Sequence, residues 1–336
     1  MRRNVAVIGA GAWGTALANL FAGKGHATTL WSFEADVADD VNERHENSRY
    51  LPGIHLDPRL RSTGDLRAAV TDKDAVVSVS PAQHVRGVMA EAGPHLADDV
   101  IVISASKGIE RGSLATMAEV LEEILPAGTG FRSAFLSGPS FAIEVARGLA
   151  TAVTVASLNE ATARAAQDLF QTANFRVYTS SDVAGVELGG ALKNVIALAA
   201  GMAVGLGLGH NATAALITRG LAEIARLGVA RGANPLTLAG LAGMGDLILT
   251  CTGDLSRNRY VGVELGKGRK LDEILAGMRQ VAEGVDTARA AHDLALRESI
   301  EMPIVNEVHA VLFENRTARE ALENLMLREP KPEIWS

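Results

Sequence analysis

The sequence predicts an α/β protein in which a mostly parallel, doubly wound sheet is followed by an all-helical second domain. The first half of the 336 residues alternates short apolar segments with helix-like ones, and continuous apolar runs are typical of buried parallel strands. Repeated strand–helix–strand units imply right-handed crossovers. From Val183 onward, long Ala- and Leu-rich stretches dominate and strand signals become scarce. A chain of this length exceeds a usual single core, which favours two domains.

The predicted strands are short and apolar, and in chain order they are Val5–Ile8, Thr28–Trp31, Ala75–Val79, Val100–Ser104, Ala134–Leu136, Thr151–Val155 and Arg176–Tyr178. Helix-like segments lie between several of them, at Thr15–Ala22, Gln83–Leu96, Ser113–Leu125 and Glu160–Gln171. Further helices are predicted at Val186–Ala200, Thr213–Arg226, Pro235–Leu241, Thr287–Ser299 and about Thr317–Leu327. Because the pattern changes near residues 180–188, we expect a sheet domain over residues 1–184 and a helical domain over residues 185–330.

A glycine-rich turn separates the first strand from the first helix. Its sequence is Gly9-Ala-Gly11-Ala-Trp13-Gly14. Strand, GxGxxG turn and helix in this order are typical of dinucleotide binding in a Rossmann domain. Gly9 permits the tight turn, Gly11 lets the backbone approach a pyrophosphate, and Gly14 allows close packing of the helix on the strand. An ordinary glycine turn is the alternative, and the position directly after a β-branched strand disfavours it.

Composition and charge limit the class of partner. The formal net charge is −7 without a long basic run, which argues against nucleic acid. Cys251 is the single cysteine, so an intrachain disulfide is excluded and a small packing role is expected. The eight histidines lack metal-ligand spacing, which gives a histidine metal site no support. Val195–Gly209 is expected to be too short and glycine-rich to cross a membrane, and with no signal peptide visible we expect a soluble, cytoplasmic protein.

A nicotinamide enzyme needs a group that exchanges a proton with the substrate oxygen at a pKa near the working pH. Lys193 is the first candidate, because it is the only charge between Glu187 and His210 on a helix that is expected to be buried. Burial and nearby cations would lower its pKa. The alternative is that Lys193 extends to the surface. Asn194, beside it, could hold a hydroxyl or carbonyl oxygen.

Other polar residues fall where a crevice is expected. Lys107 and Ser137-Gly138-Pro139-Ser140 follow strands at their carboxyl ends, where ligands of such sheets bind. Asp246 could orient the Lys193 ammonium, and helix N-capping is its competing role. Thr250 and the loop Ser256-Arg257-Asn258-Arg259 together offer donors that suit a phosphate, and a polar surface loop is the alternative.

Seven segments, in this order, closely resemble bacterial NAD(P)-dependent glycerol-3-phosphate dehydrogenases over essentially the whole chain. They are Gly9–Gly14, Ser106–Gly108, Ser137–Ala142, Gly185–Asn194, Gly243–Asp246, Ser256–Arg259 and Val281–Gly284. The resemblance implies a Rossmann domain, an all-helical 6-phosphogluconate dehydrogenase-like domain and a homodimer. It also implies that NAD or NADP serves in the interconversion of sn-glycerol 3-phosphate and dihydroxyacetone phosphate, which supplies glycerophospholipid synthesis.

The resemblance, together with the motifs described above, predicts the site residues. Lys193 is expected to be the general acid/base, with Lys107 and Asp246 as its catalytic neighbours. The expected substrate contacts are Lys107, Gly138, Ser140, Lys193, Asn194, Asp246, Thr250, Ser256, Arg257 and Asn258. The expected cofactor contacts are Gly9, Gly11, Ala12, Trp13, Gly14, Phe33, Lys107, Ala142, Arg257, Val281 and Glu283.

One departure from the family pattern concerns the cofactor. After the second strand the family often places Arg or His, whereas this chain has Phe33 and Glu34. A carboxylate at that position would favour the free 2′-hydroxyl of NAD, although the choice between NAD and NADP stays open. Two other functions also stay open: a dehydrogenase acting on another phosphorylated or β-hydroxy acid, and a dinucleotide sensor without turnover. The complete lysine, aspartate and arginine set disfavours the sensor.

Overall fold

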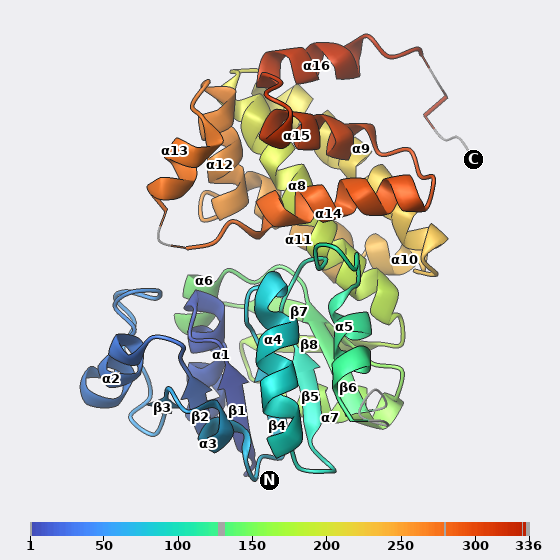
Figure 1. Ribbon diagram of the computed structural model, residues 1–336. Coiled ribbons are helices and arrows are strands. Elements are labelled where there is room, and N and C mark those ends of the chain that lie inside the picture. Colours follow the sequence, from blue (N-terminus) through green and yellow to red (C-terminus); the bar gives the residue numbers. More distant parts are fainter. Residues whose placement is uncertain (1, 127–131, 279, 331, 334–336) are drawn as a thin grey trace.

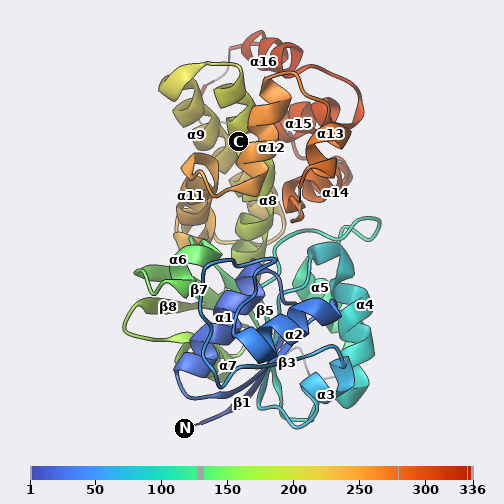
Figure 2. The same ribbon diagram turned by 90° about the vertical axis from the view of Figure 1, so that its left-hand side faces the viewer.

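A computed structural model describes residues 2–126, 132–278, 280–330 and 332–333. The sheet and its helices form one layered unit, and the remaining helices form a second unit beyond the carboxyl ends of the parallel strands (Figures 1 and 2). The prediction of a doubly wound sheet followed by an all-helical unit is confirmed.

The eight-stranded sheet has the order β3-β2-β1-β4-β5-β6-β7-β8. Every neighbouring pair is parallel except β6 and β7, which are antiparallel. The strands are β1 (Asn4–Ile8), β2 (Ala27–Trp31), β3 (Arg61–Thr63), β4 (Ala75–Ser78), β5 (Ile101–Ser104), β6 (Ser133–Ser137), β7 (Thr151–Ala156) and β8 (Phe175–Ser180). The seven predicted strands are therefore present, while β3 was missed because three residues without an apolar run carry no strand signal.

Helices cover both faces of the sheet, because successive residues of each buried strand point to opposite faces. Val5 and Val7 pack in the core beneath one set of helices, and Ala6 and Ile8 pack beneath the other. The first set is α1 (Ala12–Gly23), α2 (Ala35–Arg44), α6 (Ala142–Ala146) and α7 (Glu160–Phe170). The second set is α3 (Leu66–Val70), α4 (Ala82–Ala92) and α5 (Met117–Ile124).

Two predicted helix boundaries in this unit are wrong. The helix predicted from Ser113 begins at Met117, because Leu114 has a left-handed φ of 60° and Thr116 forms a capping box with Glu119. The helix predicted to reach Leu96 ends at Ala92 and continues as a 3-10 turn, η1 (Gly93–His95).

The helical unit is built around α8 (Val183–Gly205), which is longer than predicted. Its other helices are α9 (Gly209–Ala230), α10 (Pro235–Leu238), a π-helical turn η3 (Leu241–Gly245), α11 (Asp246–Thr252), α12 (Arg257–Gly266), α13 (Leu271–Ala276), α14 (Glu283–Arg297), α15 (Pro303–Phe313) and α16 (Ala318–Met326). The predicted Pro235–Leu241 helix is broken at Ala239, and Ser256–Arg259 forms the start of α12 instead of a loop.

The helix that contains most of the apolar stretch Val195–Gly209 begins at Val183 and has 23 residues, so it is longer than that stretch predicted. By length and composition, α8 and the stretch Pro235–Thr252 both qualify as candidate spans among the described residues. However, 89% of the most apolar window of α8 is buried inside the protein, as in the core helix of a globular unit.

Backbone contact between α8 and α12 positions the site. A Cβ on Gly201 would lie 2.2 Å from the carbonyl oxygen of Arg259, and one on Gly262 would lie 2.1 Å from that of Leu198. Glycine at these positions therefore lets the two helices pack backbone to backbone. As a result, the first turn of α12 lies beside the middle of α8.

Candidate active site

Two lysines from different units share one buried carboxylate. Lys193 of α8 donates a hydrogen bond from Nζ to Asp246 Oδ1, and it donates a second to Thr250 Oγ1 at 2.9 Å. Lys107, in the loop after β5, donates from Nζ to Asp246 Oδ2 at 2.6 Å and to the Gly138 carbonyl at 3.3 Å. Lys193 is 7% exposed and Asp246 is 1% exposed. The alternative in which Lys193 extends to the surface is therefore wrong.

The geometry of α8 against η3 brings these groups together. A Cβ on Gly189 would lie 2.8 Å from the Ala242 carbonyl, so the two backbones touch one turn before Lys193. The π-helical turn then ends at Asp246, the first residue of α11. Both carboxylate oxygens of Asp246 face lysines instead of backbone N–H groups, so the N-capping alternative is also wrong.

Burial and charge set the protonation of this cluster. Burial lowers the pKa of Lys193 to about 8, with Lys107 acting in the same direction and Asp246 opposing. Burial alone would raise the pKa of Asp246, but the two ammonium groups outweigh it and hold that pKa below its usual value. Burial raises the pKa of the nearby Cys251 thiol to about 12, which agrees with a packing role.

A second polar group continues from Lys193 to the start of α12. Asn258 donates from Nδ2 to Asn194 Oδ1 at 2.9 Å, and its Oδ1 accepts from the Gly284 N–H at 2.9 Å. Ser256 caps α12 by accepting the Arg259 N–H at 3.2 Å, and Arg257 is exposed in the first turn. A helix N-terminus with an accessible guanidinium is suited to an anion.

The remaining predicted substrate residues lie after β6. Gly138 has φ of 142°, and a Cβ there would lie 2.8 Å from Val153 Cα, so glycine is required. Ser140 donates its hydroxyl to the Gly138 carbonyl at 2.9 Å. Since Lys107 contacts the same carbonyl, this turn borders the lysine cluster.

The glycine turn fits a dinucleotide on two observations. A Cβ on Gly14 would lie 1.9 Å from the Gly9 carbonyl, whereas one on Gly11 would meet no described atom within 4 Å. Packing therefore demands glycine at position 14, while space above Gly11 is open for a ligand group. In addition, the Nε1 of Trp13 is buried without a hydrogen-bond partner among the described residues.

A pocket of about 470 Å³ lies between the end of β2 and α4. Its lining residues are Trp31, Phe33, Gly64, Leu66, Gln83, His84, Gly87, Val88 and Glu91. Phe33 is 84% exposed and can offer its ring to a flat base. Apart from Phe33, the sequence carried no signal for this pocket, because its walls come from segments far apart in the chain.

Glu34, the residue before α2, has its carboxylate occupied. It accepts the Tyr50 hydroxyl at 2.5 Å and lies 3.9 Å from the Arg49 guanidinium. The preference for NAD over NADP therefore stays a prediction.

Glu283, the first residue of α14, lies beside the loop that carries Lys107. Its Oε2 lies 3.8 Å from the position of a Cβ on Gly108, next to Lys107. Burial raises the pKa of Glu283 to about 7, and the charge of Arg257 opposes this. Val281 is half-exposed, and Phe33 lines the pocket between β2 and α4. Ala12 begins α1 and Ala142 begins α6.

Comparisons with known proteins show which family the chain belongs to. Residues 4–163 match the profile described as NAD-dependent glycerol-3-phosphate dehydrogenase N-terminus, and residues 182–323 match the corresponding C-terminus. The chain is 55% identical to the glycerol-3-phosphate dehydrogenase [NAD(P)+] of Geobacter sulfurreducens, with 100% of both chains covered. The Myxococcus xanthus protein of the same name is also 55% identical, with 98% of each chain covered.

A solved structure of glycerol-3-phosphate dehydrogenase from Coxiella burnetii superposes with a TM-score of 0.92 at 38% identity, covering 97% of this chain and 99% of that one. The chain therefore belongs to the NAD-dependent glycerol-3-phosphate dehydrogenase family.

Proposed function

We propose that this protein interconverts sn-glycerol 3-phosphate and dihydroxyacetone phosphate, with Lys193 as the general acid and base. The observation that carries the proposal is the buried Lys193 ammonium, which Asp246 and Thr250 hold by hydrogen bonds. Relatives that are 55% identical over nearly the whole chain and are named glycerol-3-phosphate dehydrogenase [NAD(P)+] support the choice of substrate.

NAD or NADP would be held by the glycine turn and by Phe33 at the pocket after β2. The other residues proposed to contact it are Lys107, Ala142, Arg257, Val281 and Glu283. When bound, the nicotinamide gives a hydride to the substrate carbon or takes one from it. The open space above Gly11 and the orphaned Trp13 Nε1 agree with this placement.

Lys193 exchanges the proton. In the reducing direction its ammonium donates a proton to the ketone oxygen as that oxygen gains charge, and a neutral amine remains. In the oxidising direction the neutral amine removes the proton from the hydroxyl group. Because the pKa of Lys193 is lowered to about 8, both forms are available near neutral pH. Within the described part of the chain, two N–H groups of the Lys193 ammonium donate to Asp246 and Thr250. The third N–H group is left for the substrate oxygen.

The phosphate of the substrate would bind at the start of α12, where Arg257 and Asn258 follow the capping Ser256. Contacts there use binding energy away from the reacting carbon to hold the substrate in a reactive geometry. Asn194, Gly138 and Ser140 would complete the contacts to the substrate.

The family assignment supports further proposals. The protein would supply glycerol 3-phosphate for glycerophospholipid synthesis, as a homodimer in the cytoplasm. We also propose a dinucleotide-binding domain over residues 1–184 and a substrate domain over residues 185–330. The change from β8 to α8, which Asp182 caps by accepting the Gly185 N–H at 2.8 Å, supports this division.

The test is NADH and NADPH consumption with dihydroxyacetone phosphate in wild type and Lys193→Ala, with cofactor binding measured separately by fluorescence. Loss of the acid should lower turnover by roughly 10²–10⁴-fold while cofactor binding persists. Lys267→Ala, which removes an exposed lysine paired with Glu264 at 2.8 Å, is the matched control and should keep full turnover. Near-normal turnover of Lys193→Ala would refute the assigned role, and a preference for β-hydroxy acids in a substrate screen would refute the substrate.

A further inference from the structure

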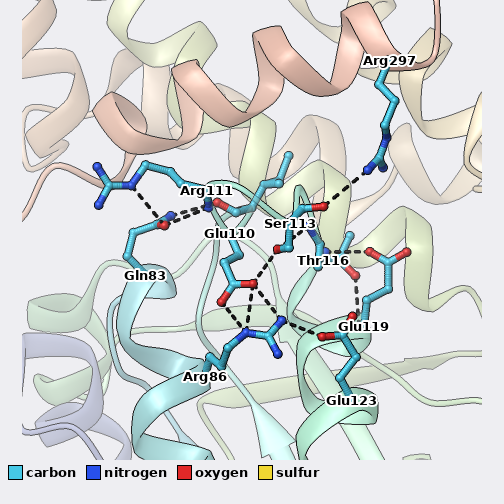
Figure 3. Close-up of polar contacts among 11 residues, drawn as sticks. Gln83, Arg86, Glu110, Arg111, Ser113, Thr116, Glu119, Glu123 and Arg297 are labelled. Carbon is cyan, nitrogen blue, oxygen red and sulfur yellow. Dashed lines mark hydrogen bonds and ion pairs between the residues drawn. The ribbon is translucent and has the colours of Figure 1, made fainter.

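Gln83 binds the backbone of the loop that carries Lys107. It lies in the first turn of α4, and its Nε2 donates to the Ile109 carbonyl at 2.9 Å. Its Oε1 accepts the Arg111 N–H at 2.9 Å (Figure 3). One primary amide thus satisfies a backbone acceptor and a backbone donor two residues apart, which only a side chain with both functions can do.

The two residues next to Lys107 in the chain, Ser106 and Gly108, also contact α4 or the turn before it. Ser106 donates its hydroxyl to the Ser80 carbonyl at 2.6 Å. A Cβ on Gly108 would lie 2.6 Å from Ala82 Cβ, so the loop backbone is in close contact with α4. Lys107 is therefore flanked by anchored residues, and its reach to Asp246 depends on where that backbone sits.

Ion pairs lie beside the Gln83 contacts, and Figure 3 shows those of Arg86 with Glu110 and Glu123. Arg86 pairs with Glu110 at 2.8 Å and with Glu123 at 2.8 Å, and Arg111 pairs with Asp286 of α14 at 3.2 Å. Glu123 and Arg111 are more than half exposed, so solvent screens their pairs. The hydrogen bonds of Gln83 act on the backbone itself, at Ile109 and Arg111.

Gln83 also lines the 470 Å³ pocket at the end of β2. The residue consequently lies between the pocket that Phe33 lines and the loop of Lys107, which reaches Asp246. No part of the reaction described above assigns it a role.

We propose that Gln83 is a positioning residue, which holds the loop so that Lys107 reaches Asp246 and Asp246 in turn directs Lys193. This inference rests on the proposed function of Lys193. Gln83 does not touch the reacting atoms, and it acts through the hydrogen bonds to Ile109 and Arg111.

A shift of the loop has a defined electrostatic consequence. The groups that face Lys193 are Asp246, Thr250 and Cys251 of α11 and Lys107 of the loop. If Lys107 withdraws, Lys193 loses a neighbouring cation, and the full charge of Asp246 acts on it alone. Both changes raise the pKa of Lys193. The limb of the pH–kcat profile that reports Lys193 should then move to higher pH, which simple loss of stability would not cause.

The experiment compares Gln83→Ala and Gln83→Glu with wild type at saturating NADH. The glutamate variant keeps the size and the acceptor for Arg111, but when ionised it cannot donate to Ile109. We expect kcat to fall by about 10- to 100-fold in both, since small misplacements of catalytic groups have such effects. The control is Gln167→Ala, which removes a 2.7 Å bond from Nε2 to the Val177 carbonyl on the far side of the sheet and should leave kcat and the profile unchanged.

A double-mutant cycle with Lys107→Met separates the possible outcomes. If Gln83 acts through Lys107, Gln83→Ala should cause little further loss in the Lys107→Met background. An unchanged kcat and pH profile in both Gln83 variants would overturn the proposal, as would fully additive losses. A change confined to the Kd of NADH, with kcat unaltered, would also overturn it. Failure of the proposed function itself would appear separately, as normal turnover of Lys193→Ala.

Discussion

Asp246→Asn tests the central electrostatic arrangement. The substitution removes the one carboxylate between two ammonium groups without changing the size of the side chain. A charge pair about 4 Å apart at an effective dielectric of about 20 interacts by roughly 4 kcal/mol, or about 3 pH units. In the reducing direction, deprotonation of Lys193 removes the proton donor, so Lys193 sets the alkaline limb of the pH–kcat profile. That limb should therefore move down by roughly 2 to 3 pH units. At pH 7 most of the lysine would then be neutral and unable to donate a proton.

The same substitution leaves two cations in a buried site. Breaking a buried pair by removing one partner typically costs about 3–5 kcal/mol, so the free energy of unfolding should fall by that order. Chemical denaturation measures this change, and a pH series of kcat under conditions where the variant is folded measures the limb.

Lys107→Met provides the opposite perturbation. It removes a cation whose charge lowers the pKa of Lys193, so the limb should move up instead of down. Limbs that move in the same direction in the two variants, or that do not move, would refute the reasoning.

Three further predictions concern other parts of the molecule. Gly14→Ala should lower the melting temperature markedly, because the added Cβ would lie 1.9 Å from the Gly9 carbonyl. Gly11→Ala should keep the melting temperature, because its Cβ meets no described atom within 4 Å, but it should weaken NADH binding measured by fluorescence titration. Lys24 Nζ donates to the carbonyls of Asp168, Leu169 and Gln171 at 2.7, 2.8 and 2.7 Å. Lys24→Met should therefore lower the free energy of unfolding, measured by urea denaturation, by about 1.5–3 kcal/mol without changing kcat. An equally stable variant would contradict this. Burial raises the pKa of Glu223 to about 7 from 4.5, so its protonation stabilises the folded state below pH 4.5 and this contribution is lost as pH rises through 7. The free energy of unfolding of wild type relative to Glu223→Gln should accordingly fall by up to about 3 kcal/mol between pH 4.5 and 8, and a constant difference would contradict the assignment.

Local sequence was sufficient for features that depend on neighbouring residues. The apolar runs at Val5–Ile8 and Ala75–Val79 correspond to strands, because burial on both faces demands continuous apolar residues. The close approach at Gly14 follows from the GxGxxG spacing alone. Lys193 could be singled out because one charge in an otherwise apolar helix requires a partner or a function.

Boundaries and partners were beyond local reasoning. Leu114 adopts a left-handed backbone that its residue type disfavours, and this delays the start of α5. The three residues of β3 form a strand because β2 offers its edge. Ser256–Arg259 resembles a polar loop in composition, yet packing of α12 on α8 makes it the first turn of a helix beside Asn194.

The sequence by itself determined the alternation of elements, the glycine turn and the identity of the buried lysine, because periodicity and side-chain chemistry act over a few residues. Only the tertiary structure decided that one carboxylate joins Lys193 to Lys107, which lie 53 and 139 residues from Asp246 in the chain. Which partner a buried charge finds depends on how α8, η3 and the loop after β5 pack together. Those contacts arise from the whole fold, and no local pattern encodes them.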